Sequence, residues 1–346
     1  MKSFKVTFQP SNTSIKCRAD QTIAQAAEQQ GVDIFIGCDN GVCTICQSER
    51  ISGTFQFRNT LGQELLTSED RVLCCIAKPT SNAELYMPSV HHADYKEARN
   101  YACQIASMTQ IAEQMWHVQL LLPAGKTADF WPGQHLLLEI KDANGIIEQV
   151  PYSIGSAPTS IMGGDPRKID LYIASSGEKA QCVICFLRAA VVVRLTLPMG
   201  DCIINQRFLD NHPNQPLIMV AAGSGFSQIK CLTEAALMLN PKQEIHLYWS
   251  AREQSEFYLT EQIEQWAKQH PNFRYHLLLE EAKAEWTGRS GWIYQVLKED
   301  FANFSQHQMF VCGSPNMVYG TLDQLAGLGL SEQNMHSDVF TYAPRN

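Results

Sequence analysis

The sequence has no long hydrophobic run. Its longest apolar stretch, Ala189–Leu197, is interrupted by Arg194, whereas a helix that spans a bilayer needs about 18 consecutive apolar residues. The N-terminus also lacks the continuous apolar segment of a signal peptide, because apolar and polar residues alternate over Phe4–Phe8 as they do in a strand. We therefore expect a cytoplasmic protein that does not bind a membrane.

Positive charge is also in short supply. The chain has 27 Lys and Arg against 35 Asp and Glu, a formal net charge of -8, which argues against nucleic acid or an anionic membrane surface as a main partner. With 45% hydrophobic and 18% charged residues, the composition is that of a globular protein. A length of 346 residues predicts two or three domains.

Cysteine, by contrast, is abundant, with 12 residues. In a long chain without an export signal we do not expect disulfides, so metal binding or burial must account for the thiols. Five of them cluster between Cys38 and Cys75. The other seven are scattered, and we expect them to be small core residues: Cys17, Cys103, Cys182, Cys185, Cys202, Cys231 and Cys312.

Three of the clustered cysteines, Cys38, Cys43 and Cys46, have the spacing C-x4-C-x2-C, and another follows far downstream at position 74 or 75. This is the ligand spacing of a plant-type [2Fe–2S] cluster. A compact loop that turns tightly at Gly41 would hold three thiolates, and a distant strand would supply the last. Zinc is the competing interpretation, but zinc sites usually use paired C-x2-C knuckles, and this segment has only one.

Local patterns surround this loop with a small hairpin and a helix. The alternation over Phe4–Phe8 and Ser14–Cys17 predicts a β-hairpin, and Thr22–Gln30 has a helical pattern. Residues 91–99 lack periodicity and are interpreted as a linker. We expect its adjacent His91 and His92 to be solvated rather than bound to a metal.

The middle of the chain, from about residue 100 to 210, has the pattern of short strands separated by turns, which predicts a small antiparallel barrel. The strands are expected at Gln104–Ser107, His117–Leu122, His135–Ile140, Tyr152–Ile154, Asp170–Ile173 and Val191–Leu197.

The remainder alternates apolar strands with helical stretches, as in an open parallel sheet. The strand Leu217–Val220 runs into Gly223-Ser224-Gly225 and then into the helical segment Ile229–Leu239. Glycines at such a turn let the backbone approach a pyrophosphate, whose negative charge a helix N-terminus favours. The alternative is that these glycines merely form the turn.

The chain resembles reductases of the ferredoxin–NADP reductase family that carry a plant-type ferredoxin domain. The resemblance implies a multidomain fold: an α+β β-grasp ferredoxin domain at 1–90, the linker at 91–99, an antiparallel β-barrel flavin domain at 100–210 and an α/β Rossmann-like nicotinamide domain at 211–346. It rests on motifs that occur in the family's order, at Gly37–Cys46, Val72–Pro79, Trp131–Gln134, Val150–Pro158, Ala221–Gln228, Trp286–Gly291, Cys312–Met317 and Met335–Phe340.

For the cluster, the resemblance implies the ligands Cys38, Cys43, Cys46 and Cys75. Position 75 is selected because the family's last ligand precedes a basic residue and a proline, which stand here at positions 78 and 79. Thr44 departs from the family pattern, in which this position is usually glycine.

For the flavin, the resemblance places Tyr152 on the isoalloxazine ring and Ser153 at its reactive edge, next to Pro151. Val150 stands where the family has an arginine that contacts the flavin phosphate. Losing such a charge-assisted contact costs about 1.5–3 kcal/mol, which weakens binding by about one to two powers of ten.

The phosphate-binding helix of the flavin domain is expected to start after Gly177. Ala180 or Gln181 stands where the family has a Ser or Thr. Backbone N–H groups at Lys179 and Ala180 remain available for a phosphate. Lys179 could supply the missing charge, or it could be an ordinary solvated lysine.

For the nicotinamide, the resemblance implicates Gly223, Ser224 and Gly225 and then the turn that contains Gly313, Pro315 and Met317. The residues at 222 and 228, alanine and glutamine, depart from the family's glycine and proline. Arg252 could pair with the 2′-phosphate of NADPH, but the neighbouring residue at 253 is a glutamate that would repel it, so we expect NADH.

Two further side chains are implicated near the reacting groups. Cys312 is interpreted as a structural neighbour of the nicotinamide rather than a nucleophile, because no histidine is placed by sequence to activate it. Phe340 and the acid at 338 lie in what resembles the family's terminal strand, where an acid and an aromatic residue face the flavin.

By this resemblance, the chain is an oxidoreductase of electron transport that passes electrons from NADH through FAD to a [2Fe–2S] cluster. It then delivers them to a partner oxygenase or deoxysugar dehydrase component. FMN is the alternative flavin. The alternative function is an iron–sulfur redox sensor or binding protein whose flavin site is degenerate. The sequence does not identify the terminal acceptor.

Overall fold

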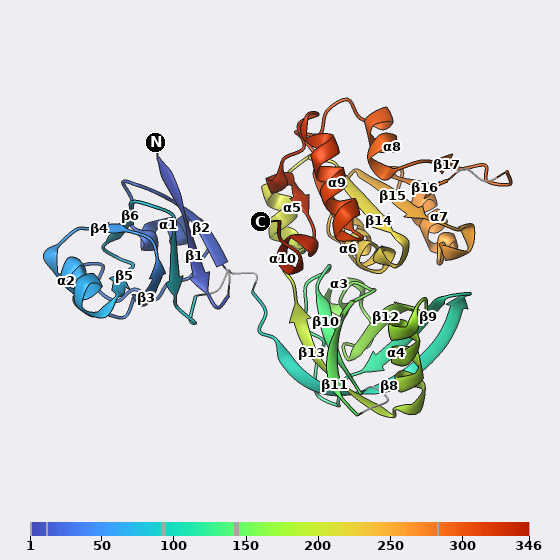
Figure 1. Cartoon of the computed structure of the whole chain (residues 1–346), viewed down its shortest axis with the longest axis horizontal. Coiled ribbons are helices and arrows are strands. Elements are labelled where there is room, and N and C mark those ends of the chain that lie inside the picture. The colour runs from blue at the N-terminus through green and yellow to red at the C-terminus, as the bar shows by residue number, and fades with distance from the viewer. Residues whose placement is uncertain (1, 12, 91–94, 142–144, 282–283, 346) are drawn as a thin grey trace. The chain divides into compact units, whose positions relative to one another are not determined.

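The structure is a computed structural model that describes residues 2–11, 13–90, 95–141, 145–281 and 284–345. The chain divides into two compact units, Met1–Tyr95 and Lys96–Asn346 (Figure 1). Residues 91–94 of the expected linker, including both histidines, lie outside the described residues. Among the helices that the structure describes, none is long and apolar enough to cross a membrane.

The first unit contains the predicted hairpin, which is confirmed as β1 (Ser3–Gln9) and β2 (Thr13–Arg18), paired antiparallel. The other strands of its sheet are β3 (Gln47–Ser52), β5 (Arg71–Leu73) and β7 (Ala83–Tyr86), in the order β2-β1-β7-β3-β5. β1 and β7 run parallel. A separate antiparallel pair is formed by β4 (Phe55–Phe57) and β6 (Ala77–Pro79).

The predicted helix of this unit is confirmed as α1 (Ile23–Gln29). Thr22 caps it: its hydroxyl accepts from the Gln25 N–H at 3.3 Å, and the Gln25 side chain accepts from the Thr22 N–H at 3.1 Å. This reciprocal arrangement satisfies two donors that a helix start leaves open. The apolar face of α1 is buried in the core of the unit. The second helix, α2 (Thr60–Glu69), lies between β4 and β5 in the chain.

In the second unit, residues up to about 200 form an antiparallel sheet in the order β11-β10-β13-β8-β9-β12. Its strands are β8 (Arg99–Ala112), β9 (Met115–Leu121), β10 (His135–Lys141), β11 (Ile147–Ser153), β12 (Lys168–Ala174) and β13 (Val192–Met199). Two helices, α3 (Thr159–Met162) and α4 (Glu178–Ala189), accompany it. All six predicted strands are present, although β11 begins five residues before its predicted start at Tyr152.

The rest of the second unit is a parallel sheet in the order β17-β16-β15-β14-β18-β19. Its strands are β14 (Leu217–Ala222), β15 (Ile245–Ala251), β16 (Phe273–Leu279), β17 (Arg289–Ser290), β18 (Gln308–Cys312) and β19 (Met335–His336). The central strands are buried on both sides, which explains their continuous apolar sequence.

Helices cover both faces of this parallel sheet (Figure 1). One core contains side chains of α6 (Phe226–Leu239) and α7 (Thr260–Gln269), and the other contains those of α8 (Ile293–Asp300) and α9 (Pro315–Ala326). The short helices α5 (Gln206–Asn211) and α10 (Val339–Tyr342) complete the unit. The expected terminal strand over Met335–Phe340 is wrong in part, because only two residues pair with β18 before the chain turns into α10.

Candidate functional site

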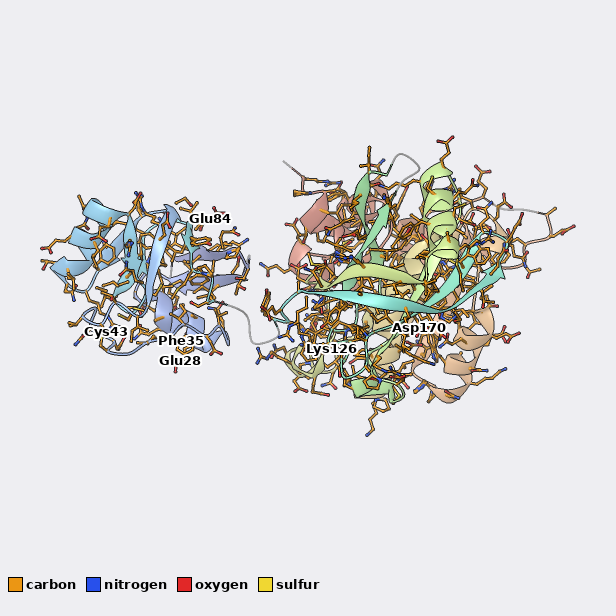
Figure 2. All side chains as sticks on the ribbon, turned by 90° about the horizontal axis from the view of Figure 1, so that it is seen from below. Glu28, Phe35, Cys43, Glu84, Lys126 and Asp170 are labelled. Carbon is orange, nitrogen blue, oxygen red and sulfur yellow. The ribbon has the colours of Figure 1, made fainter. Side chains whose placement is uncertain are left out.

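The loop between α1 and β3 and the segment after β5 bring two pairs of cysteines together. The Cys43 N–H donates to Cys38 Sγ at 3.3 Å, and the Cys75 N–H donates to Cys46 Sγ at 3.4 Å. Within each pair the side chain of one cysteine also affects the pKa of the other: Cys43 contributes to the lowered pKa of Cys38, and Cys46 to the raised pKa of Cys75. A [2Fe–2S] core held by four thiolates needs two sulfurs at each iron, so this arrangement fits such a core. Cys43 is labelled in Figure 2.

Backbone N–H groups of the loop point at these sulfurs. Those at positions 40, 43 and 42 lower the pKa of Cys38 to about 6. Burial raises the pKa of Cys75 to about 12, while the Gly41 N–H acts in the opposite direction. Gly41 has a φ of +86°, and an added Cβ would lie 2.8 Å from Ile76. This turn therefore requires glycine, as the sequence predicted.

Cys74 and its neighbour Cys75 are both completely buried in the core of the first unit, but their sulfurs have different surroundings. The Sγ of Cys74 lies 3.7 Å from the hydroxyl of Ser48. Burial raises the pKa of the Cys74 thiol to about 12. Cys75, in contrast, is paired with Cys46 through its backbone N–H, and the nearby thiols of Cys46 and Cys38 contribute to its raised pKa.

The geometry bears on the zinc alternative as well. A structural zinc ion is held by four ligands at once in a tetrahedron. Within the described ranges, no three Cys, His, Asp or Glu side chains lie close enough to hold a single metal ion. Two separate pairs of sulfurs suit a core with two metal atoms better than a single ion.

Thr44, the departure from the family's glycine, has a φ of +57°. This left-handed conformation costs an L-residue about 1–2 kcal/mol, and a β-branched one is a genuine outlier there. Its hydroxyl donates to the Cys43 carbonyl at 2.7 Å. The family's preference for glycine at this position therefore has a local steric reason, and Thr44 retains the conformation at a cost.

A pocket of about 970 Å³ lies at the carboxyl ends of the parallel strands. This edge of an open α/β sheet is where ligands generally bind. Of the predicted nicotinamide residues, four line the pocket: Gly223, Ser224, Arg252 and Met317. Four glutamates, at positions 113, 253, 256 and 280, also line the pocket beside Arg252.

Gly225 joins the two nicotinamide motifs. A Cβ at this position would lie 2.4 Å from the Cys312 carbonyl oxygen and 3.1 Å from Cys312 Sγ, so only glycine permits this approach. Cys312 is partly buried, and burial raises the pKa of its thiol to about 12. A thiol that stays protonated is a poor nucleophile.

The turn after β18 leads directly into the N-terminus of α9. Ser314 caps α9, its hydroxyl accepting from the Met317 N–H at 3.4 Å, and Pro315 occupies the first turn, where a missing N–H has no cost. A Cβ on Gly313 would lie 2.5 Å from the Met317 side chain and 3.2 Å from that of Ala222. The alanine that departs from the family's glycine at 222 thus fits against Gly313.

A second cluster lies where the two sheets of this unit meet. Ser153 ends β11, and His135 stands opposite it in the register of β10. The His135 Nδ1 lies 3.5 Å from an oxygen of Asp338. Among the described residues, neither His135 Nδ1 nor Asp338 Oδ1 has a hydrogen-bond partner, although both are buried. Buried polar atoms normally have partners, so these two fit a polar ligand such as a flavin edge.

Gln228 holds this cluster together. Its side-chain amide donates to the Gly133 carbonyl at 2.6 Å and to Asp338 Oδ2 at 2.8 Å. Proline, the family's residue at this position, has no side-chain amide and could make neither bond. The departure noted in the sequence therefore has a structural role, which the sequence did not reveal because both partners are distant in the chain.

The two aromatic residues that are expected to face the flavin, Tyr152 and Phe340, pack against different parts of the second unit. Tyr152 is partly buried against the core of the antiparallel sheet, and burial raises its pKa to about 12. Phe340 packs on Tyr319 of α9, with ring centroids 5.5 Å apart. Tyr342, two residues further along α10, is 64% exposed. Partial burial raises the pKa of Tyr342, and the nearby Cys312 and Asp338 raise it further.

The expected flavin-phosphate helix is α4, whose N-cap is Gly177 at a φ of +87°. No side chain caps it. The ammonium of Lys179 forms an ion pair with Glu148 of β11. Val150 is buried in the core of the sheet rather than facing solvent. Lys179 is thus an exposed residue whose positive charge is paired with the Glu148 carboxylate.

The scattered cysteines follow the sequence prediction in most positions. Five are buried or partly buried, at Cys17, Cys103, Cys202, Cys231 and Cys312. Cys182 and Cys185 contradict it, because both are exposed on α4. Their spacing of three residues places them on one side of the helix, whereas the buried side chains of α4 are Val183, Ile184 and Leu187.

Comparison with known proteins supports these assignments at the level of domains. The 2Fe-2S iron-sulfur cluster binding domain family matches residues 6–80, and the oxidoreductase NAD-binding domain family matches residues 219–323. The reductase component 1 of terephthalate 1,2-dioxygenase from Comamonas sp is 28% identical over 344 residues, 98% of each chain. The CDP-6-deoxy-L-threo-D-glycero-4-hexulose-3-dehydrase reductase of Yersinia pestis is also 28% identical over 344 residues, 98% of each chain.

A solved structure has the same fold. The Amycolatopsis cytochrome P450 reductase GcoB matches with a TM-score of 0.64 and 21% identity, over 97% of this chain and 98% of that one. The chain is therefore an iron–sulfur oxidoreductase with a ferredoxin reductase-like flavin- and NAD-binding fold. More particularly, it combines a 2Fe-2S iron-sulfur cluster binding domain with an oxidoreductase NAD-binding domain, and over nearly its whole length it is similar to proteins that are named as reductase components.

Proposed function

We propose that the chain takes electrons from NADH, through FAD, to a [2Fe–2S] cluster held by Cys38, Cys43, Cys46 and Cys75, and delivers them to a partner protein. The observation that carries this proposal is the pairing of the four sulfurs across the loop and the segment after β5. Its donor set is four thiolates in two pairs, which is the set that a two-iron core requires. The boundaries of the three expected domains and the barrel form of the antiparallel sheet belong to the same proposal.

FAD would bind along the antiparallel sheet, with its ring at the ends of β10 and β11. When bound, flavin exchanges hydride with a nicotinamide and single electrons with an iron–sulfur centre. Tyr152 would contact the ring, and Ser153 would lie at its edge. The unpartnered oxygen of Asp338 and nitrogen of His135 would face the polar edge of the flavin. Gln228 holds Asp338 in that orientation.

NADH would occupy the pocket at the carboxyl ends of the parallel strands. The glycine turn before α6 presents backbone N–H groups to the pyrophosphate, and Cys312, in contact with Gly225, closes the site beside the nicotinamide. Arg252 shares the pocket with carboxylates at 253, 256 and 280. These carboxylates repel the 2′-phosphate of NADPH, so we expect kcat/KM to favour NADH by about tenfold or more, a difference of ~1.4 kcal/mol.

The partner is proposed to be an oxygenase or dehydrase component. The support is that relatives matching the chain over nearly their whole length are named as reductases of a dioxygenase and of a deoxysugar dehydrase. The choice between these two partners is open, and co-purification from cells that express each candidate component would decide it.

The experiment that tests the proposal is NADH-dependent reduction of cytochrome c by the purified chain supplied with FAD. The wild type should reduce cytochrome c, a one-electron acceptor. Cys75→Ser should lose this activity while retaining NADH oxidation with ferricyanide, which flavin can reduce directly. A wild type that oxidises no NADH with either acceptor would show that the flavin site is degenerate and would favour the redox-sensor alternative.

A further inference from the structure

An ion pair lies buried inside α6, the helix that follows the glycine turn. The Lys230 ammonium lies 2.6 Å from Glu234 Oε1, and the two side chains are only 4% and 5% exposed. Exposed pairs at this spacing contribute little, and buried pairs suffer a desolvation penalty that often equals their attraction. A buried pair is therefore weak support for stability alone, and its other contacts show what it does.

Both members of the pair bond to the chain that follows β11. Lys230 Nζ donates to the Gly155 carbonyl at 3.0 Å, and Glu234 Oε2 accepts from the Ala157 N–H at 3.1 Å. The other carboxylate oxygen also accepts from Gln262 of α7 at 2.9 Å. Burial lowers the pKa of Lys230, but the adjacent carboxylate outweighs this effect and the net shift is upward, so the lysine is charged.

The segment 155–157, which the ion pair holds, lies directly against α6. A Cβ on Gly155 would lie 2.4 Å from the Tyr172 ring and 3.0 Å from the Ser227 hydroxyl. The segment begins two residues after Ser153, so its position fixes where Tyr152 and Ser153 end β11. Any shift between α6 and this segment would therefore move these two side chains.

A second network holds the same segment from the antiparallel sheet. The Gly155 N–H donates to the backbone carbonyl of Asp170 in β12, and the Ser156 hydroxyl donates to the Asp170 carboxylate, each at 2.7 Å. Asp170 also bonds with His117 at 2.7 Å and Gln119 at 2.9 Å; it is labelled in Figure 2. Burial favours its neutral form, but these hydrogen bonds prevail and hold the pKa of Asp170 below its ordinary value. The segment is thus anchored to the antiparallel sheet by the backbone carbonyl and the carboxylate of Asp170, and to α6 by the ion pair.

We propose that Lys230 and Glu234 are positioning residues that fix the end of β11 relative to the glycine turn at the start of α6. Charge-assisted hydrogen bonds are directional and hold a register that apolar contacts alone would leave free to slide. The pair thereby sets the position of the flavin-contacting residues against the nicotinamide pocket. This inference rests on the proposed function, in which Tyr152 and Ser153 contact flavin and the glycine turn binds NADH.

The test compares single and double variants of the full chain. Lys230→Met or Glu234→Leu alone leaves a buried charge without its partner and should strongly destabilise the unit. The double variant, Lys230→Met with Glu234→Leu, removes both charges and should regain most of the lost thermal stability. Flavin bleaching at saturating NADH, followed by stopped flow, should nevertheless remain about 10- to 100-fold slower than wild type, because small misplacements of reacting groups are that costly.

A second readout does not depend on turnover. The visible circular dichroism of bound flavin reports the surroundings of its ring and should differ between the double variant and wild type. The matched control is the surface pair of Arg167 and Asp165, whose side chains are about one-third exposed. Arg167→Met with Asp165→Asn should change neither the bleaching rate nor the dichroism.

Glu234→Asp provides an independent variant in case the double variant folds poorly. It retains the charge but withdraws the carboxylate from Ala157 by about 1.5 Å, one carbon–carbon bond, and it should also slow bleaching. A stable double variant, or a folded Glu234→Asp variant, with wild-type rate and dichroism would overturn the positioning role. If NADH bleaches no flavin even in wild type, the proposed function fails as well, which distinguishes the two failures.

Discussion

The adjacent cysteines Cys74 and Cys75 offer a matched pair of substitutions for the cluster site. Cys75→Ser replaces one sulfur of the Cys46–Cys75 pair by an oxygen that binds iron poorly. We expect this variant to lose most of the two iron atoms and the acid-labile sulfide that a [2Fe–2S] core contains. Cys74→Ser should retain both, because its side chain contacts Ser48 in the core.

The stability of the Cys74 variant without iron tests the surroundings of this side chain separately. Cys74 is completely buried, and a hydroxyl in its place loses about 1–3 kcal/mol wherever it fails to find a full set of partners. The Ser48 hydroxyl offers one partner, so we expect a loss at the lower end, about 1 kcal/mol. Cys74→Ala, which buries no polar group, separates the hydroxyl effect from the loss of sulfur.

The assay is iron and sulfide analysis of protein prepared without oxygen, together with visible spectra and urea unfolding of each variant. Loss of iron from Cys75→Ser and retention in both Cys74 variants would confirm the ligand assignment. The reasoning is refuted if Cys74→Ser loses the iron and Cys75→Ser keeps it, because the sulfur pairing described above would then not be the one that binds.

Other substitutions test separate parts of the account. Thr44 has a φ of +57°, which glycine adopts without strain, so Thr44→Gly should stabilise the first unit by about 1 kcal/mol in urea unfolding. The control Thr67→Gly, in helix α2, should destabilise the unit by a similar amount. Stabilisation by both substitutions would contradict the steric argument. Glu148→Gln frees Lys179 and should tighten FAD binding roughly two- to fivefold by fluorescence titration; unchanged affinity would show that Lys179 does not meet the phosphate. Burial lowers the pKa of His336 from 6.5 to about 4, so the unfolded chain takes up this proton first and the stabilising contribution is lost as pH falls from 6.5 towards 4. The stability difference between wild type and His336→Phe should therefore shift against wild type by up to about 3 kcal/mol over that interval, and a constant difference would refute the assigned pKa.

Local sequence patterns predicted the elements that local physics determines. The hairpin of the first unit, α1 with its buried alanine-rich face and the apolar strand before the glycine turn all appear where periodicity placed them. β11 was predicted too short, because it extends back to Ile147. Pro151 cannot donate to a ladder, but the strand lies at the edge of its sheet, where a proline is tolerated.

Contacts between distant segments could not be predicted in this way. Gln228 stood out only as a departure from proline. Its hydrogen-bond partners, Gly133 and Asp338, are separated from it by 95 and 110 positions in the sequence. The spacing of Lys230 and Glu234 is visible in the sequence, but the same spacing on a surface helix is ordinary, and only the fold buries it. Exposure of Cys182 and Cys185 was missed because a cysteine carries no sequence signal for which face of a helix it occupies.

The account stands on electron flow from NADH through flavin to a two-iron centre in a single chain. The most direct measurement is an anaerobic titration of the iron-loaded, FAD-supplied protein with NADH, followed by visible absorbance. We predict that the flavin and iron–sulfur bands both decrease, and that Cys75→Ser shows only the flavin change. Iron–sulfur bands that are unaffected by excess NADH in wild type would contradict the account.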